Sequence, residues 1–362
     1  MEIIWLKKLS VEVSVKKQSV VGLIFILIIL VSVEIGIRTY ENFSLPCEFV
    51  NTDVFKNTDS MIKRSMCLDS IYLQTTKTPI TLYQPNQNLD TITINSQGFR
   101  GPDFLLPKPS DTFRIFVVGG STTFGFGTIA DDTSIPGFLQ QQFNQSEKNV
   151  EVINAGIGAA WSFSEKFLIE NYIQNYEPDL VVVYDGANDS RYGILSEEKK
   201  NTVGFGDFIP NFYRTPYFLN DVVFKIGFSG NKSIETDDAK IKSISSLWKT
   251  RMQNICDIGH EKNFSVAIIL QPMLATDNRD LIGDEVMFYE QHLDKHGQNA
   301  IEIYNIMKSS LNTLDRCTIT NDFTNAFDNT KTAVYWDDVD ITEQGNEIIA
   351  KKMFNLFLPL ID

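Results

Sequence analysis

The chain has 362 residues, of which 43% are hydrophobic, and it carries a formal net charge of −14. This length suffices for one large domain or two modest ones. The acidic balance argues against a nucleic-acid partner, because such a partner needs a basic face for its phosphates. Only three histidines are present, so a multi-histidine metal centre is not expected.

An apolar segment near the N-terminus is the first feature in chain order. The sequence from Val20 to Val33 is apolar apart from Gly22 and Ser32. The whole stretch 19–37 is near the lower limit of length for a helix that spans a bilayer. We therefore predict a transmembrane helix over residues 19–37. A cleaved signal peptide is the alternative because the apolar core is short, although no small-x-small cleavage site follows it.

The charges around this segment predict its orientation. Four basic residues precede it and one follows it, namely Lys7, Lys8, Lys16, Lys17 and Arg38. Positive charge favours the cytoplasmic side of a membrane. We therefore expect residues 1–18 in the cytoplasm and the main domain outside, held by an uncleaved single-pass signal anchor.

The cysteines fit this placement. An even count in an exported protein suggests disulfides, and the chain has four cysteines. The simplest pairing joins the near pair, Cys47 with Cys67, and the far pair, Cys256 with Cys317. Four reduced cysteines would be expected if the orientation were reversed.

The remainder of the chain divides into an extension and an α/β domain. Residues 38–100 are polar with few regular periods, and we expect a juxtamembrane extension there, ahead of a domain over 101–362. Strands are predicted at 114–119, 150–154, 180–184, 265–270 and 317–320. Helices are predicted at 135–143, 163–176, 245–260, 286–314 with a break near Gly297, and 342–358. This alternation predicts a doubly wound, mostly parallel five-stranded sheet of the flavodoxin-like type.

Two long connections leave the carboxyl end of this sheet. One is an insertion at about 190–242 after the third strand, and the other runs from Pro272 to Asp284 after the fourth. Insertions at this edge usually shape a substrate site.

The stretch Arg114 to Gly127, RIFVVGGSTTFGFG, contains the first predicted strand and the first candidate site residue. A buried strand ends at Gly119 and Gly120, and Ser121 follows at the carboxyl edge of the sheet, where α/β proteins bind ligands. The two glycines let the backbone turn and leave room for a substrate. A serine that only caps the next helix is the structural alternative.

Two further glycine-bearing turns follow the next two strands. VINAGIGAAWS, Val152 to Ser162, offers bare backbone N–H groups, and DGANDS, Asp185 to Ser190, presents an asparagine side chain on a turn. This arrangement suits acyl transfer, in which a serine attacks an ester and preset donors stabilise the oxyanion. The candidate donors are the N–H of Ser121, an N–H of the Gly158–Ala159 turn, and the amide of Asn188.

At these residues the sequence resembles the SGNH (GDSL-type) hydrolase family, over roughly Asn95 to Leu358. Four segments carry the resemblance: Gly119-Gly120-Ser121, the run from Asn154 through Gly156 to Ala159, Gly186-Ala187-Asn188-Asp189, and NSQGFRG at 95–101. The resemblance implies Ser121 as nucleophile and no metal or organic cofactor. Direct spacing places the family's glycine donor at Ala159, next to Gly158.

The family's last block departs from its pattern. In Asp337-Asp338-Val339-Asp340 the orienting acid matches Asp337, but Asp340 stands where the histidine base belongs. A carboxylate with an ordinary pKa of about 3.9 is a poor base. Loss of a triad base costs on the order of 10⁴ to 10⁶ in rate. Like-charge crowding of the two acids would raise one pKa, or a histidine would reach the site from elsewhere: His260, His292 or His296.

Two functions follow from this sequence. The first is a membrane-anchored esterase, with its main domain outside the cytoplasm, that acts on an acylated glycan or lipid. Ser121, Asp337 and Asp340 would be its catalytic residues. The second is a catalytically silent member that binds glycan or scaffolds the cell envelope. The sequence does not specify the oligomeric state.

Overall fold

A computed structural model of the chain describes residues 15–43, 47–77, 79–191, 238–292 and 295–361. Contacts divide the chain into two compact units, one of them Cys47–Val203 with Glu235–Asp362. The residues expected to form an extension from Cys47 onward therefore pack with the α/β domain. Most of the predicted insertion at 190–242, and the N-terminal residues before Val15, lie outside the described residues.

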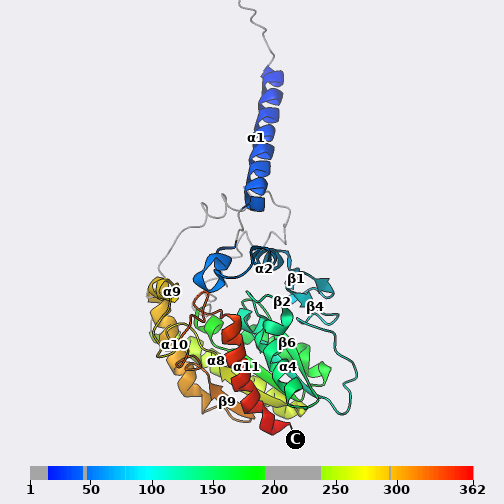
Figure 1. Cartoon of the computed structure of the whole chain (residues 1–362), viewed down its shortest axis with the longest axis vertical. Coiled ribbons are helices and arrows are strands. Elements are labelled where there is room, and N and C mark those ends of the chain that lie inside the picture. The colour runs from blue at the N-terminus through cyan, green and yellow to red at the C-terminus, as the bar shows by residue number, and fades with distance from the viewer. Residues whose placement is uncertain (1–14, 44–46, 78, 192–237, 293–294, 362) are drawn as a thin grey trace, which may run out of the picture. The chain divides into compact units, whose positions relative to one another are not determined.

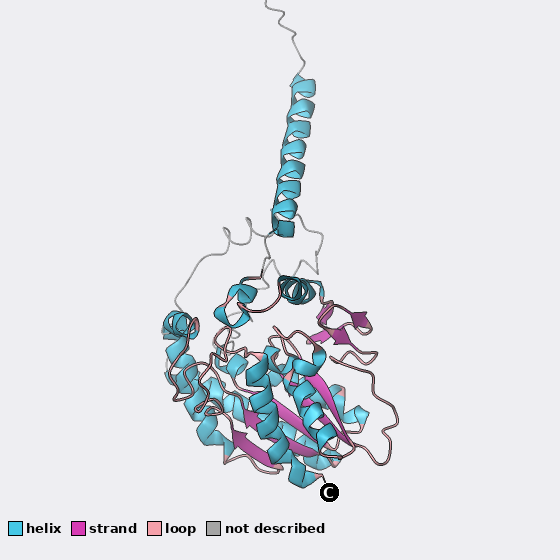
Figure 2. Cartoon of the chain, viewed as in Figure 1, coloured by secondary structure: helices cyan, strands magenta, loops and turns pink. Residues whose placement is uncertain are grey.

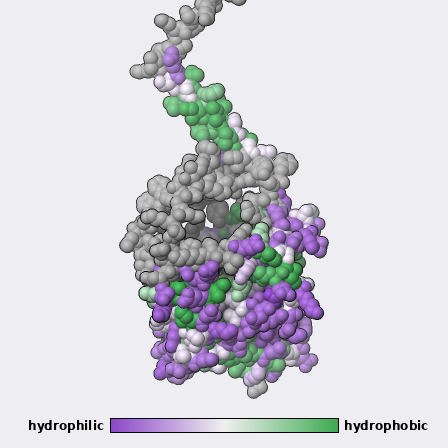
Figure 3. Space-filling model, turned by 90° about the vertical axis from the view of Figure 1, so that its left-hand side faces the viewer, coloured by the Kyte–Doolittle hydropathy of each residue, from purple (hydrophilic) through white to green (hydrophobic). Residues whose placement is uncertain are grey.

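The other unit contains helix α1 (Val15–Phe43), which is longer at both ends than the predicted segment. Within it, Lys17–Gly36 is long and apolar enough to cross a membrane. Its side chains from Val20 to Ile35 are largely exposed apolar groups, and they appear as a mainly hydrophobic surface in Figure 3. An apolar N-terminal helix is therefore confirmed, while its orientation stays a prediction.

The α/β unit is built on a parallel five-stranded sheet with the order β6-β5-β7-β8-β9. The strands are β5 (Phe113–Gly119), β6 (Val150–Gly156), β7 (Leu180–Asp185), β8 (Ser265–Leu270) and β9 (Ile319–Asp322). This is the doubly wound, flavodoxin-like arrangement that the sequence predicts. The last strand begins two residues later than expected, at Ile319, and Cys317 just before it is bonded to Cys256.

Helices cover both faces of the sheet (Figure 2). On one face α4 (Ile135–Gln145) packs against α11 (Glu343–Phe357), and on the other α8 (Asp238–Lys262) packs against α5 (Ser162–Asn171) and α10 (Lys295–Leu311). Thr342 caps α11 as expected, accepting the N–H of Gly345 at 3.3 Å. Strand and helix side chains from the first face form one apolar core, including Ile115, Leu139, Val182, Ile269, Ile349 and Phe357.

Shorter elements complete the unit (Figure 1). The predicted helix at 286–314 is two helices, α9 (Glu285–His292) and α10, and the break precedes Gly297. Short helices also occur at α3 (Ser121–Phe124), η3 (Asp131–Thr133), η4 (Ile173–Tyr176) and η7 (Leu358–Leu360).

The segment before the sheet is more regular than the sequence suggests. It contains η1 (Glu48–Asn51), η2 (Asp53–Phe55), α2 (Ser60–Tyr72) and two small hairpins, β1–β2 (Thr75–Lys77, Thr81–Tyr83) and β3–β4 (Gln87–Asn88, Thr93–Ile94). Asp59 caps α2, because its Oδ1 accepts the N–H of Met61 at 2.8 Å. The hairpin strands are too short to give a hydrophobic period, and α2 buries only Met66, Cys67 and Asp69, so it shows no clear apolar face.

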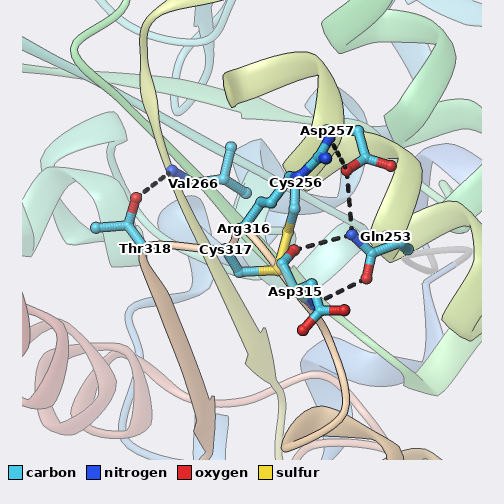
Figure 4. Close-up of a disulfide and its surroundings, with 8 residues drawn as sticks. All are labelled: Gln253, Cys256, Asp257, Val266, Asp315, Arg316, Cys317 and Thr318. Carbon is cyan, nitrogen blue, oxygen red and sulfur yellow. Dashed lines mark hydrogen bonds and ion pairs between the residues drawn. A yellow bond between two sulfur atoms is a disulfide. The ribbon is translucent and has the colours of Figure 1, made fainter. Parts of the chain in front are cut away.

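Both predicted disulfides are present. Cys47 is bonded to Cys67, and Cys256 of α8 is bonded to Cys317 ahead of β9. Figure 4 shows the second bridge beside Gln253, whose amide binds the backbone N–H and C=O of Asp315 at 2.9 and 2.8 Å. The bridge and this amide together tie α8 to the start of the last strand.

Candidate active site

The strand order places two of the predicted turns side by side. Strand β6 is added on one side of β5 and strand β7 on the other, so the strand order reverses between β5 and β7. In α/β sheets, ligands bind beyond the carboxyl ends of the strands at such a switch point. Ser121 follows β5 and begins α3, and Asn188 follows β7. Two residues far apart in the sequence therefore share one crevice edge.

Gly120 is the point at which these two turns touch. A Cβ on Gly120 would lie 2.6 Å from the Asn188 Nδ2, a separation that real contacts do not allow. The neighbouring Gly119 is equally confined, since its Cβ would lie 2.2 Å from the Thr123 Oγ1. Both glycines are thus required by the close approach of Asn188 and Thr123, whereas the room for a substrate that the sequence analysis expects beside them stays a prediction.

The Asn188 amide is held by its neighbours. Its Nδ2 donates to the Ala160 carbonyl at 2.6 Å, and the side chain is 8% exposed. The next residue, Asp189, accepts the N–H of Ser162 at 2.7 Å and also the Ser162 hydroxyl. Gly186 has φ +131°, which L-residues rarely adopt. These contacts fix the amide while one of its two N–H groups remains for a ligand.

The third predicted turn differs from the expectation at Gly158. Its N–H donates to the Tyr83 Oη at 2.9 Å, so this group is not free to face a substrate. The turn is closed by the N–H of Ala160 to the carbonyl of Ile157 at 2.9 Å. Ala159 has φ +58° and is exposed. Within the described chain, the Ala159 N–H is left as the donor of this turn.

The last block forms a tight loop that brings Asp340 to the nucleophile. The N–H of Trp336 donates to the Asp340 carbonyl at 3.1 Å and closes the loop. The Asp340 Oδ1 accepts the Thr122 hydroxyl at 2.9 Å, and the neighbouring Ser121 side chain is one of the groups that lower the pKa of this carboxyl. The Asp340 carboxyl thus lies beside the first turn of α3, which begins at Ser121, and Asp340 is only 7% exposed.

Asp337 organises this loop through its backbone. Its Oδ1 accepts the N–H groups of Val339 and Asp340 at 2.7 and 2.6 Å. Its neighbour Asp338 is buried and forms an ion pair with Arg191, the residue that ends the described part of the Asn188 turn. The loop that carries Asp340 is thus linked to the turn that carries Asn188.

Both acids hold their protons more tightly than usual. Burial, and next to it the charge of Asp337, raises the pKa of Asp340 well above its ordinary value. Burial and the charge of Asp338 raise the pKa of Asp337 to about 6. A carboxylate with a raised pKa is a stronger base when it is ionised. The like-charge effect expected from the sequence is therefore present, although burial is the larger cause.

The structure removes one of the three candidate histidines. His260 is exposed in the last turn of α8, which leads into the start of β8. It lies at the amino edge of a parallel sheet, opposite Ser121. His292 and His296 flank residues 293–294, and their side chains lie outside the described part of the structure.

Among the described residues, no cluster of His, Cys, Asp or Glu has a geometry that would hold a metal.

A cavity of about 230 Å³ lies beside the end of β6. Aromatic and aliphatic groups dominate its wall, including Tyr83, Phe99, Ile157, Leu168, Tyr172 and Tyr176.

Tyr83 and Thr122 are the site contacts that the sequence analysis missed. Thr122 is adjacent to the predicted nucleophile, whereas Tyr83 belongs to a segment with no motif and could be found only from the fold.

No family model matches the sequence, and no curated protein matches it. In structure the chain is similar to the acetyl xylan esterase AlAXEase, at 14% identity and a TM-score of 0.42, covering 67% of this chain and 99% of that one. It is also similar to the acetylxylan esterase Axe2 of Geobacillus stearothermophilus, at 12% identity and a TM-score of 0.41, covering 67% and 93%. A third is a protein of Desulfitobacterium hafniense DCB-2 described as lipolytic and of the G-D-S-L family, at 10% identity and a TM-score of 0.40, covering 67% and 98%.

Proposed function

We propose that the chain is an SGNH-type serine acyl hydrolase that acts outside the membrane on an acylated glycan or lipid. The observation that carries this proposal is the setting of Ser121, which lies between the Asp340 carboxyl and the turn that holds the Asn188 amide. A capping serine has no need of either group. In this proposal α1 attaches the enzyme to the membrane, and the disulfides suit an oxidising exterior.

The proposed reaction begins when Asp340 accepts the Ser121 hydroxyl proton as the Ser121 Oγ attacks the ester carbonyl. The carbonyl oxygen becomes an oxyanion, and the N–H groups of Ser121 and Ala159 and the Asn188 amide donate to it. The protonated Asp340 then gives its proton to the leaving alcohol, and water repeats the sequence on the acyl-enzyme. Asp340 acts only when it is ionised, so the rate rises with pH toward its raised pKa.

The test uses the full chain in detergent micelles. We expect hydrolysis of p-nitrophenyl acetate, and labelling of Ser121 by a fluorophosphonate. Both are lost in Ser121→Ala and kept in Ser309→Ala, which alters an exposed serine of α10. Labelling that persists in Ser121→Ala would contradict the assignment of the nucleophile.

Asp340 itself favours a second candidate, a catalytically silent protein that binds acylated glycan or scaffolds the envelope. Burial keeps the Asp340 carboxyl protonated to higher pH than an ordinary carboxyl, and a protonated carboxyl cannot accept the Ser121 proton as a neutral histidine would. An absence of both turnover and labelling, with glycan binding that survives Ser121→Ala, would support this candidate instead.

A further inference from the structure

Tyr83 connects the segment before the sheet with two turns of the candidate site. It is the last residue of β2 and is 6% exposed. Its ring packs on Phe124 of the nucleophile helix, with ring centroids 4.6 Å apart. Its hydroxyl accepts the Gly158 N–H at 2.9 Å. One side chain thus contacts both the helix that begins at Ser121 and the turn that carries the Ala159 N–H.

The turn needs such an anchor because its conformation is unfavourable. Ala159 has φ +58°, and a left-handed conformation is unfavourable for an L-residue because its Cβ crowds the backbone. The ends of the turn are held, because the Ile157 N–H donates to the Gly119 carbonyl and the Asn188 Nδ2 donates to the Ala160 carbonyl. Inside the turn, the Ala160 N–H donates to the Ile157 carbonyl. The Tyr83 hydroxyl adds a tie at Gly158, directly before the strained residue, and this bond offsets part of the strain.

Arg100 fixes the surroundings of Tyr83 from the same segment. Its Nη1 donates to the carbonyls of Phe124 and Gly125 at 2.9 and 2.7 Å, and its guanidinium lies 5.0 Å from the Phe124 ring. Arg100 also pairs with Asp131 at 2.7 Å and is 3% exposed. The Phe124 surface against which Tyr83 packs is therefore rigidly held.

We propose that Tyr83 is a positioning residue of the candidate active site. Its hydroxyl accepts the Gly158 N–H and holds the Gly158–Ala159 turn, so that the Ala159 N–H stays directed at the oxyanion. The segment between the membrane helix and the sheet is then required for acyl transfer and does more than space the domain from the membrane. This inference rests on the proposed function, and it adds a residue that acts through the Gly158–Ala159 turn.

The first test is Tyr83→Phe in the full chain. The ring and its packing on Phe124 remain, and only the hydroxyl is lost. We expect kcat for p-nitrophenyl acetate to fall about tenfold with KM unchanged, a part of the 10²- to 10³-fold cost of losing one oxyanion donor outright. Hydrogen exchange of the amides at 157–161 should become faster. Tyr72→Phe is the matched control because Tyr72 lies in the same segment, at the end of α2, and is 58% exposed, and it should change neither quantity.

The second test is rescue by Ala159→Gly in the Tyr83→Phe background. Glycine adopts positive φ without the Cβ penalty, so the turn would hold its shape with one tie fewer. We expect the double variant to recover most of the lost kcat. A purely structural loss in the β2 segment would not be repaired by a change at residue 159.

The outcomes separate the two proposals. A parent chain without turnover or labelling defeats the proposed function, and the positioning role falls with it. An active parent whose Tyr83→Phe variant keeps its kcat overturns the positioning role alone. A loss of kcat that Ala159→Gly does not restore likewise overturns it, since the defect then lies outside the turn.

Discussion

The two sides of the candidate site differ in how well their residues suit acyl transfer. On the proposed nucleophile side, a Cβ on Gly120 would lie 2.6 Å from the Asn188 Nδ2, and this amide donates to the Ala160 carbonyl. On the proposed proton-accepting side, Asp340 is buried beside a second carboxyl with a raised pKa. The proposed nucleophile side is thus closely packed, whereas the proposed base is chemically unusual.

The largest expected effect comes from placing a histidine base on the proton-accepting side. Asp340→His should raise kcat/KM for an activated ester by about 10²- to 10⁴-fold, the usual worth of a well-matched general base. Adding Ser121→Ala to this variant should abolish the gain. A folded Asp340→His chain with no gain would mean that more than the base is missing, and the contrast between the two sides would disappear.

The nucleophile side can be disrupted by a substitution that leaves Ser121 and Asn188 unchanged. Gly120→Ala would place a methyl 2.6 Å from the Asn188 Nδ2 and force that amide away. We expect activity to fall about 10²-fold or more, and the unfolding free energy to fall by about 1–3 kcal/mol from overpacking. Gly36→Ala in α1, where a Cβ meets nothing within 4 Å, is the matched control. Unchanged activity in Gly120→Ala would rule out Asn188 as a donor.

The smallest expected effect is the pH dependence of the unfolding free energy that the raised pKa of Asp337 causes. Asp337 has a folded-state pKa of about 6, above the ordinary 3.8, so the folded chain keeps a proton that the unfolded chain loses. Its contribution to stability is therefore full below pH 3.8 and is lost as the pH rises to about 6, by roughly 2–3 kcal/mol.

Asp337→Asn keeps an acceptor oxygen for the loop and removes this titration. Urea unfolding from pH 4 to pH 7 should show a flatter profile for this variant than for the parent. Asp132→Asn, at an exposed position, serves as the control and should follow the parent. A parent profile that rises across this range, and is unchanged by Asp337→Asn, would contradict the cause given for the raised pKa.

Hydrophobic pattern and spacing were enough to predict most of the α/β unit. The buried strands β5, β7 and β8 each contain an unbroken apolar run, so their predicted bounds agree to within a residue. The disulfides agree with the simplest pairing that the spacing and an even count in an exported protein suggest. The segment from Cys47 to Arg100 is more regular than predicted, because its hairpin strands are very short and α2 buries only a few of its residues.

By itself the sequence determined which residue types follow each strand, and hence that Ser121, the Gly158–Ala159 turn and Asn188 end up at one edge of a parallel sheet. Only the tertiary structure decided that Tyr83 binds the Gly158 N–H and that Asp340 is buried against Thr122. Local propensities act over a few residues, and they carry no information about such contacts. Strand order, burial and the pKa shifts that burial causes arise only when segments far apart in the chain exclude water together.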